Sequence, residues 1–527
     1  MRTENSIRNI IVSCISYGIL FVGSFVTRKI FAAALGLEYV GIDGAFTSII
    51  SALAIVEMGL GVGIVYKLYK PIACKDWAQV SSILCFLRKS YVIISLTVLG
   101  LGASIAYFVV QPIKEDFSKA WLIQIFILYV LDVVASYLFS HKRSMFIADQ
   151  KNYVNNLIHI FAQVLMFISQ IAVLKIFCSF EAYLICRIAC RLIENIWISY
   201  RFDKNYGFIN LKKKSDLPDI EKRDLFRNIK AMLLHKISAF GATGLSSLII
   251  VYGVGLKETG VYNNYMLIVT AIMTITNEIF NSIVASFGNL LNTSTAKEKI
   301  YNNFNALYFL NFLIYSFGIS AFVCVITPFI ELWTGIGTAF DITTVFFIAA
   351  YLYIYGIRQS LTMAKVSAGI YDPDKYISLV GSLITLVCSY FLVKPMGVSG
   401  VMLGNIIGIF LVPYMVQPYL VYSMVFHRSS KPYHYKFAFY TLLTTVYVGI
   451  SYFVCNNLFF IQNFKESLSG FLTKFHIDSQ SAVLVACVSV NFIVCLIIPN
   501  ILNILIFFRS KEFKKLASSA KSVLIRH

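Results

Sequence analysis

The most restrictive feature of this sequence is a succession of apolar runs of about 20 residues each, recurring from Ile10 to Phe508 with short polar breaks between them. A single helix needs about 20 mostly apolar residues to cross the hydrocarbon core of a bilayer, whereas a membrane barrel would alternate polar and apolar residues. Of the 527 residues, 58% are apolar or aromatic and only 13% are charged, which is about half the charged share of a globular protein. The sequence therefore predicts an all-α integral membrane protein and excludes a soluble enzyme.

The polar, Pro-containing and Gly-containing breaks separate fourteen apolar segments. We expect each of them to form one transmembrane helix. These segments cover residues 9–34, 42–66, 88–110, 120–140, 153–174, 180–200, 231–254, 260–290, 304–330, 342–368, 375–393, 398–425, 436–455 and 481–508.

The charges of the connections predict how these helices are oriented. The formal net charge is +19, from 45 Lys and Arg against 26 Asp and Glu. With the N-terminus inside, the most basic connections fall on the cytoplasmic side, at 67–89, 142–151, 201–230 and 509–526, as the positive-inside rule requires. We therefore expect both termini in the cytoplasm. Because the basic residues are dispersed over short loops, we expect no nucleic-acid partner.

Two parts of the sequence repeat at an offset of 219 residues. Gly36, Leu37 and Gly41 align with Gly255, Leu256 and Gly260, in the predicted external turn after the first helix of each half, and Lys175 aligns with Lys394. Glycines there permit a tight reversal of the chain. Six helices per half is an even number, so both halves enter the membrane in the same orientation, as in many transporters.

The repeat divides the chain into five predicted parts. Two parallel six-helix bundles occupy residues 1–202 and 231–426, joined by a basic cytoplasmic linker at 203–230; two additional transmembrane helices cover 427–508, and a basic tail covers 509–527. No connection is long enough for a catalytic domain, so we expect the function to reside in the bundles and the chain not to be an enzyme. Residues 224–234 have apolar residues at helical spacing, which suits a helix on the membrane surface that enters the seventh span, but a loop whose charges only set the orientation is the simpler interpretation. The basic tail is expected to form a helix that lies on an anionic membrane surface.

The eleven cysteines are scattered through apolar runs without metal-ligand spacing. They are interpreted as packing residues, and no metal or cofactor is expected.

Cations inside the predicted helices are candidate binding residues, because a charge at membrane depth costs about 2.5 to 3.5 kcal/mol and needs protein, water or ligand around it. Arg358 and Lys365 are seven residues apart and share a helix face. Together with Arg28 and Arg187 they predict a positively charged seam for an anionic substrate. The alternative for Arg28 and Lys365 is that their side chains extend to the nearer headgroup region.

Acids inside the predicted helices are candidates for ion coupling or for pairing with these cations. Glu57, Glu278 and Asp132 are the candidates, and coupling to H⁺, Na⁺ or the membrane potential is the corresponding expectation. Arg191 and Glu194, three residues apart, are expected to pair with each other.

Several motifs, taken in order, resemble the polysaccharide transporters of the multidrug, oligosaccharidyl-lipid and polysaccharide (MOP) flippase superfamily. The resemblance covers about residues 7–426. The motifs are Arg28 to Tyr39 with Gly41; Glu57, Gly59, Leu60 and Gly61; Tyr66 to Pro71; His235 to Ile237; Gly260 to Tyr265; Gly369 to Tyr371 with Asp374 to Tyr376; and Gly397 to Val401 with Leu403 and Gly404.

The resemblance implies two bundles like those of the multidrug (MATE) members and a flippase of the bacterial plasma membrane. Such a protein moves undecaprenyl-pyrophosphate-linked oligosaccharide by alternating access, for O-antigen, capsule, exopolysaccharide or teichoic-acid assembly. The implied partners are this glycolipid, membrane lipids, and the glycan polymerase and glycosyltransferases of the same pathway. By position in the family, Arg28 is the first expected substrate contact, and Asn263, Asn264 and Tyr265 are expected to contact sugar.

Two alternatives remain open at this point. An ion-coupled multidrug extruder of the same superfamily would favour acidic residues for cationic drugs, whereas cations outnumber acids among the candidates. An integral-membrane glycan polymerase or ligase would need a sizeable external loop, and the largest expected one covers only residues 456–480.

Overall fold

The computed structural model describes residues 2–54, 65, 67–209, 211, 244–293, 297–370, 375–474 and 478–526. Every regular element in these residues is a helix, which confirms the all-α prediction. The chain forms two compact units, Met1–Asn263 and Asn264–His527. The predicted linker 203–230 and the surface helix 224–234 lie largely outside the described residues, so the predicted domain boundaries stay predictions.

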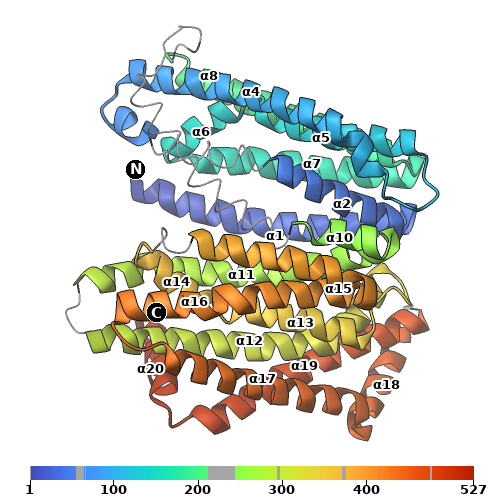
Figure 1. The fold of residues 1–527 in the computed structure, drawn as a ribbon, viewed down its shortest axis with the longest axis vertical. Coiled ribbons are helices and arrows are strands. Elements are labelled where there is room, and N and C mark those ends of the chain that lie inside the picture. Colours follow the sequence, from blue (N-terminus) through green and yellow to red (C-terminus); the bar gives the residue numbers. More distant parts are fainter. Residues whose placement is uncertain are drawn as a thin grey trace. The chain divides into compact units, whose positions relative to one another are not determined.

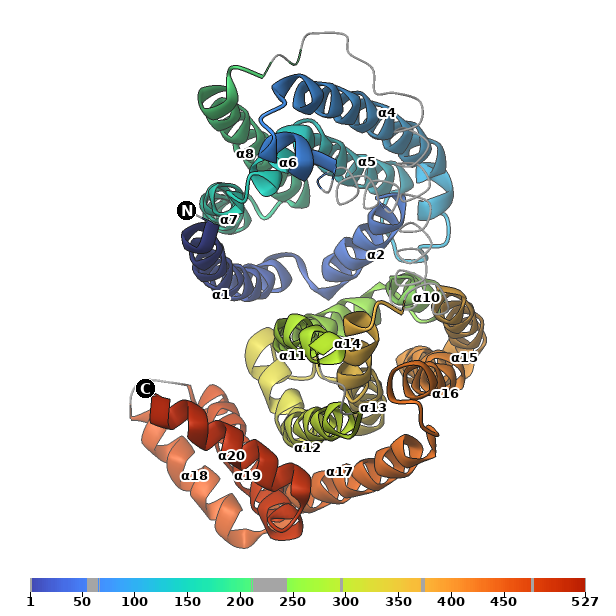
Figure 2. The same cartoon turned by 90° about the vertical axis from the view of Figure 1, so that its left-hand side faces the viewer.

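In the first unit, neighbouring helices pack in the order α1, α7, α8, α5 and α4, and α2 contacts α1, α4 and α5 (Figure 2). Their bounds are α1 Arg2–Leu35, α2 Leu37–Leu53, α4 Trp77–Val110, α5 Lys119–Tyr137, α6 Ser140–Ala148, α7 Asn152–Phe177, α8 Phe180–Tyr206 and α10 Ser246–Gly253. The buried rings of Phe46, Phe126 and Tyr129 fill the space between α2 and α5. This core holds α2 and α5 side by side, and the site described below lies on these two helices and on α1 and α8.

In the second unit, α12 lies at the centre and contacts α13, α14, α17, α19 and α20 (Figure 1). The bounds are α12 Lys297–Thr334, α13 Ile342–Gly356, α14 Gln359–Ser367, α15 Lys375–Ile409, η1 Phe410–Tyr414, α16 Met415–Val421, η2 Tyr422–Phe426, α17 Lys431–Asn457, α18 Phe459–Thr473, α19 Ser479–Phe507 and α20 Lys511–Arg526. Helix α11, Leu256–Thr293, begins in the first unit and continues into the second.

Each of the fourteen predicted segments is mainly helical in its described residues, with turns at 138–139 in the fourth segment and at 357–358 in the tenth. Nine helices of the described residues are long and apolar enough to cross a membrane, so the chain is a multi-pass membrane protein. The remaining differences have local causes. Parts of the second and seventh segments lie outside the described residues. Helix α8, the sixth predicted segment, is not among the nine because it carries more charged residues than they do. The tenth segment breaks into α13 and α14. The eleventh and twelfth segments are separate helices, as predicted, although both carry the label α15: the backbone is non-helical at Gly397, and the chain turns back there, so that Gly400 and Gly404 lie against Leu392 and Ser389.

The repeated glycines make the predicted turns. Gly36 and Gly255 both have positive φ, at 102° and 146°, a conformation that glycine adopts without steric cost. Gly41 of α2 lies against the carbonyl oxygen of Leu256, and Gly260 of α11 lies against that of Leu37; a Cβ on either glycine would come within 2.1 Å of that oxygen. This reciprocal contact within the first unit is what a two-fold relation between the two copies requires.

Three helices lie outside the predicted spans. Helix α6 follows α5 where a loop was expected, and amphipathic α18 packs along α19 in what was expected to be an irregular external loop. The predicted tail helix is present as α20, and Lys436 of α17 binds Glu512 of α20 at 2.9 Å. The ion pair explains why the tail packs on the second unit.

Candidate functional site

The charged residues of α8 lie on one stripe of that helix. Arg187 and Arg191 are separated by four residues and Glu194 follows three residues later, a spacing that places all three on the same face. This face packs against α5 and α6. Since α5 is strongly apolar, its one acid, Asp132, becomes the natural partner of the α8 cations.

Asp132 forms ion pairs with both arginines of α8. The Nε of Arg187 lies 2.9 Å from Oδ2 of Asp132, and the Nε of Arg191 lies 2.8 Å from Oδ1. The Asp132 side chain is only 5% exposed. One buried carboxylate therefore neutralises one of two arginines and fixes the orientation of both.

A second acid, Asp43 on α2, links this group to α1. Its Oδ2 lies 3.0 Å from Nη1 of Arg28, and its Oδ1 accepts a hydrogen bond from the Tyr129 hydroxyl. Nη1 of Arg187 lies 4.0 Å from the same Oδ1, and its guanidinium stacks 4.7 Å above the Tyr129 ring. Arg187 thus connects the two acids, and α1, α2, α5 and α8 meet in one network.

We call these five ionised groups the arginine network: Arg28, Asp43, Asp132, Arg187 and Arg191. Three cations and two anions leave one net positive charge. The exposed side-chain fractions are 20%, 20% and 26% for the arginines, against 14% and 5% for the aspartates. The acids therefore lie beneath the arginines, and because each guanidinium has five N–H donors, unused donors remain for an anion.

A second group of polar side chains continues along α8 beyond the arginine network. Glu194, which is 2% exposed, lies 3.1 Å from Nη2 of Arg143 and 3.0 Å from Nδ1 of His159. Arg143 also donates to Asn195 at 2.7 Å. The expected pairing of Arg191 with Glu194 is therefore wrong, because acids and bases on neighbouring helices are better placed than residues on the same helix.

His141, next to these residues on α6, is buried and uncharged near neutral pH. Burial, together with the positive charges of Lys142 and Arg88, lowers the pKa of His141 to about 4. Lys142 itself binds Asp203 at 2.8 Å and Ser199 at 2.7 Å. Lys142 thus holds α6 to α8, and the buried His141 next to it would be destabilising if protonated.

Of the predicted cations, Arg28 and Arg187 come together in the first unit, whereas Arg358 and Lys365 belong to the second. Arg358 lies at the break between α13 and α14 and donates a hydrogen bond to Gln417 of α16. Lys365 is half-buried in the last turn of α14. The break between α13 and α14 explains why Arg358 reaches α16 instead of continuing a straight tenth span.

Of the predicted acids, Asp132 lies within the arginine network. Glu278 is exposed on α11, and its neighbour Asn277 donates to the Tyr355 hydroxyl at 3.3 Å. Glu57 lies outside the described residues. A role of these acids in ion coupling stays a prediction.

The three predicted sugar contacts are packed into helix contacts in this conformation. Asn263 accepts a hydrogen bond from Ser247 at 2.9 Å and donates to the Val40 carbonyl at 3.4 Å. Asn264 is 1% exposed, and both polar atoms of its side chain are unpartnered. Tyr265 is fully buried, stacks on Phe340, and accepts a hydrogen bond from the Phe340 amide. Contact of any of them with sugar stays a prediction.

Asp43 and Tyr129 were missed by sequence reasoning. The second span was expected to begin at residue 42, which placed Asp43 at a membrane surface where an acid is common. The structure begins α2 at Leu37, which moves Asp43 into the second turn of the helix. Gly36 could have indicated the correct start of this helix. If Gly36 forms the turn, the helix begins directly after it, at Leu37.

The arginine network is confined to one copy of the repeat. At the offset of 219 residues, Ser247 and Tyr262 stand where Arg28 and Asp43 stand in the first copy. The contact between α2 and α11 at Gly41 and Gly260, which both copies share, therefore does not require these charges.

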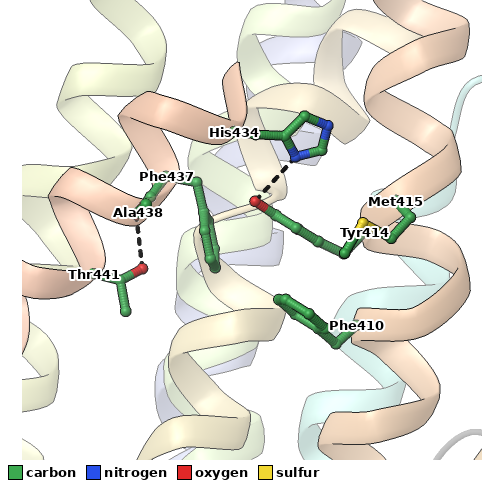
Figure 3. Close-up of a pocket in the computed structure, with 7 residues that line it drawn as sticks. All are labelled: Phe410, Tyr414, Met415, His434, Phe437, Ala438 and Thr441. Atoms are coloured by element: carbon green, nitrogen blue, oxygen red, sulfur yellow. Dashed lines mark hydrogen bonds between the residues drawn. The ribbon is translucent and has the colours of Figure 1, made fainter. Parts of the chain in front are cut away.

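A separate, mostly apolar cavity of about 400 Å³ lies in the second unit between η1 and α17 (Figure 3). Its polar group is the pair formed by His434 and the Tyr414 hydroxyl, at 3.2 Å. Phe410 and Phe437 contribute aromatic rings to the wall. This lining suits an apolar chain better than a charged group.

Taken together, the helices define a multi-pass membrane protein with the fold of MOP-superfamily transporters. The structure is similar to a lipid II flippase, MurJ, in an inward closed conformation, with a TM-score of 0.61 and 14% identity over 94% of this chain and 99% of that one. It is also similar to an inward-facing MATE multidrug resistance transporter, with a TM-score of 0.58 and 14% identity over 77% and 94% of the two chains.

A third similar structure is a MOP transporter from Pyrococcus furiosus described as having a binding pocket of reverse polarity, with a TM-score of 0.53 and 13% identity over 81% and 97%. No protein-family model and no curated protein matches the sequence. At sequence identities of 13% to 14%, the similarity establishes the fold alone. The similar structures are those of one flippase and of transporters.

Proposed function

We propose that this protein is a flippase that moves a polyprenyl-pyrophosphate-linked oligosaccharide across the bacterial plasma membrane by alternating access. The observation that carries the proposal is the arginine network, in which three arginines share two buried aspartates and keep one net positive charge. A pyrophosphate cannot cross about 30 Å of hydrocarbon without replacement of its hydration. Guanidinium groups supply this replacement through paired N–H···O bonds to phosphate oxygens.

The buried aspartates make this site pre-organised. Because Asp132 fixes the Nε atoms of Arg187 and Arg191, their terminal NH₂ groups need little further ordering to receive an anion. Asp43 and the Tyr129 ring hold Arg28 and Arg187 in the same way. Loss of side-chain entropy on binding is thereby reduced.

A multidrug extruder of the same fold is the alternative, and the pairing of the acids argues against it. A cationic drug needs an accessible carboxylate, whereas Asp132 is 5% exposed and bonded to two arginines, and Asp43 is bonded to Arg28 and Tyr129. The Pyrococcus furiosus transporter indicates that this fold tolerates reversal of pocket polarity. An integral-membrane polymerase or ligase is the weaker alternative, since the similar structures are of a flippase and of transporters.

The second unit is proposed to contribute further headgroup contacts and the coupling ion site. Arg358, with Gln417, and Lys365 are proposed as further contacts for the headgroup during transport. Coupling to H⁺, Na⁺ or the membrane potential is proposed to involve Glu278 or Glu57. We place both termini in the cytoplasm, with the polymerase and glycosyltransferases of glycan assembly as partners.

The test uses the full chain in proteoliposomes that contain a fluorescent polyprenyl-diphosphate oligosaccharide. Movement of the headgroup between leaflets is followed with a membrane-impermeant quencher. R187A is expected to lower the initial rate about tenfold or more, because one charge-assisted hydrogen bond contributes about 1.5 to 3 kcal/mol.

The matched control is R201A, which removes one exposed arginine from the end of the same helix and is expected to keep the wild-type rate. Equal rates for R187A and wild type would exclude the arginine network as the headgroup site. Transport of a cationic dye, with no movement of the glycolipid, would instead support the extruder.

A further inference from the structure

Three cysteines from three helices of the second unit meet in its interior. They are Cys324 of α12, Cys455 of α17 and Cys495 of α19. Their sulfur atoms all lie within 4.8 Å of one another, and the side chains are 5%, 0% and 0% exposed. Among the residues that the structure describes, this is the one group of three or more metal-ligating side chains so arranged.

The separation of the sulfurs suits a shared metal ion. A Zn–S bond is about 2.3 Å long, so two thiolates on one tetrahedral ion are about 3.8 Å apart. The observed upper limit exceeds this value by about 1 Å, which small side-chain rotations can supply. Three thiolates also select soft, thiophilic ions over Mg²⁺ or Ca²⁺.

The backbone around the three cysteines is held by hydrogen bonds. The Cys455 carbonyl accepts from Gln462 at 3.1 Å and from Lys465, both on α18, and the Cys324 carbonyl accepts from Asn491 of α19 at 2.8 Å. Metal ligands are commonly oriented by such supporting bonds. The Cys495 thiol donates to the Ser320 carbonyl at 3.4 Å, a bond that is lost when this thiol gives up its proton to bind a metal ion.

Lys465 is the second observation that points to an ion. Its side chain is 7% exposed, and no acidic partner for it is present in the described part of the chain. A buried ammonium without a counter-charge is costly. One divalent cation, three thiolates and this ammonium sum to zero charge, which is the favourable state for a group buried among apolar side chains.

We propose that Cys324, Cys455 and Cys495 bind one divalent thiophilic cation, with Zn²⁺ as the physiological ion and Cd²⁺ as its probe. Each thiol releases its proton to solvent as its sulfur binds the ion, and the fourth ligand is a water molecule, as in other zinc sites with three protein ligands. The ion joins α17 and α19, the predicted additional helices, to α12 of the six-helix repeat. We expect the ion to stabilise the packing of these three helices.

The experiment uses the full chain in detergent, reduced and freed of metal with a chelator. Titration with Cd²⁺ is expected to produce an ultraviolet sulfur-to-cadmium charge-transfer band that saturates at one equivalent, and to raise the Tm. C324S, C455S and C495S are each expected to lose the band and the increase in Tm. C487S, which removes a half-buried cysteine of α19 outside the cluster, is the matched control and keeps both.

Folding of each variant is checked by its Tm and by its elution in size-exclusion chromatography without metal. Because the three cysteines lie on different helices, any one folded serine variant suffices for the test. Absence of the band in wild type, or its persistence in a folded serine variant of the cluster, would overturn the proposal. A disulfide between two of the three cysteines in protein isolated without reductant would do the same.

Discussion

Arg187 lies 2.9 Å from Asp132, with its guanidinium at the same time stacked on Tyr129. Asp132 also binds Arg191, so one carboxylate orients two cations inside the first unit. The buried acid therefore offsets positive charge between α5 and α8, and we expect its loss to lower stability.

D132N is therefore expected to lower stability strongly. Asparagine has the size of aspartate but no charge, so Arg187 and Arg191 would remain partly buried without their shared acid, at a cost of about 3 kcal/mol or more. Thermal unfolding in detergent measures the effect as a lower Tm. D116N, which alters an exposed acid in a connection, serves as the control, and a D132N protein as stable as D116N would contradict this account of the network.

Arg28 can be tested for binding separately from its role as the partner of Asp43. R28A is expected to reduce glycolipid movement about tenfold, since a charge-assisted contact to phosphate is lost. D43N combined with R28A removes both charges of the pair and restores the net charge of +1 that the arginine network has in the wild type. If Arg28 contacts the headgroup, the double variant stays as slow as R28A in the proteoliposome assay; recovery of the wild-type rate would limit Arg28 to a structural role.

The glycine contact between the repeats predicts opposite effects for two substitutions of the same kind. G41A places a methyl group within 2.1 Å of the Leu256 carbonyl oxygen, and backbone must move to accommodate it, so a large decrease in Tm is expected. G100A lies in the interior of α4 with no atom within 4 Å of the new methyl group. It is expected to stabilise by about 0.5 to 1 kcal/mol through helix propensity. Equal Tm values for the two variants would show that α2 and α11 do not cross at Gly41.

His141 predicts how stability depends on pH. Burial lowers its pKa from 6.5 to about 4 in the folded protein, so between these values the unfolded chain binds the proton more readily. Neutral His141 therefore makes its full contribution to the free energy of unfolding above pH 6.5. This contribution decreases by about 3 kcal/mol in total as the pH falls towards 4.

H141Q is expected to reduce this dependence in a series of Tm measurements from pH 7 to 4. H427N, which changes an exposed histidine, is expected to leave it unchanged. An H141Q protein with the full wild-type pH dependence would assign the effect to other groups.

The apolar runs were sufficient to predict the helices, because bilayer thickness fixes the length of a span whatever its neighbours are. The same reasoning did not predict the break before Arg358, since that break depends on packing in the second unit. It did predict the break at Pro395 and Gly397, where the backbone leaves the helical conformation and the chain turns back on itself.

Ion pairs were harder to predict than helices. The four-residue spacing of Arg187 and Arg191 revealed their common face, but which acid they bind depends on the packing of α5 against α8. Cys324, Cys455 and Cys495 gave no signal at all, because they lie far apart in sequence and each resembles an ordinary packing residue of its own helix.

The restriction of the arginine network to one copy of the repeat has a consequence for how such proteins diversify. Gly41 and Gly260 preserve the crossing in both copies, whereas Ser247 and Tyr262 replace the ion pair in the second. The two copies of the repeat thus share a backbone crossing and differ in charge. If the arginine network recognises the substrate as proposed, a change of substrate requires substitutions on α1, α2, α5 and α8 and leaves the glycine crossing unchanged.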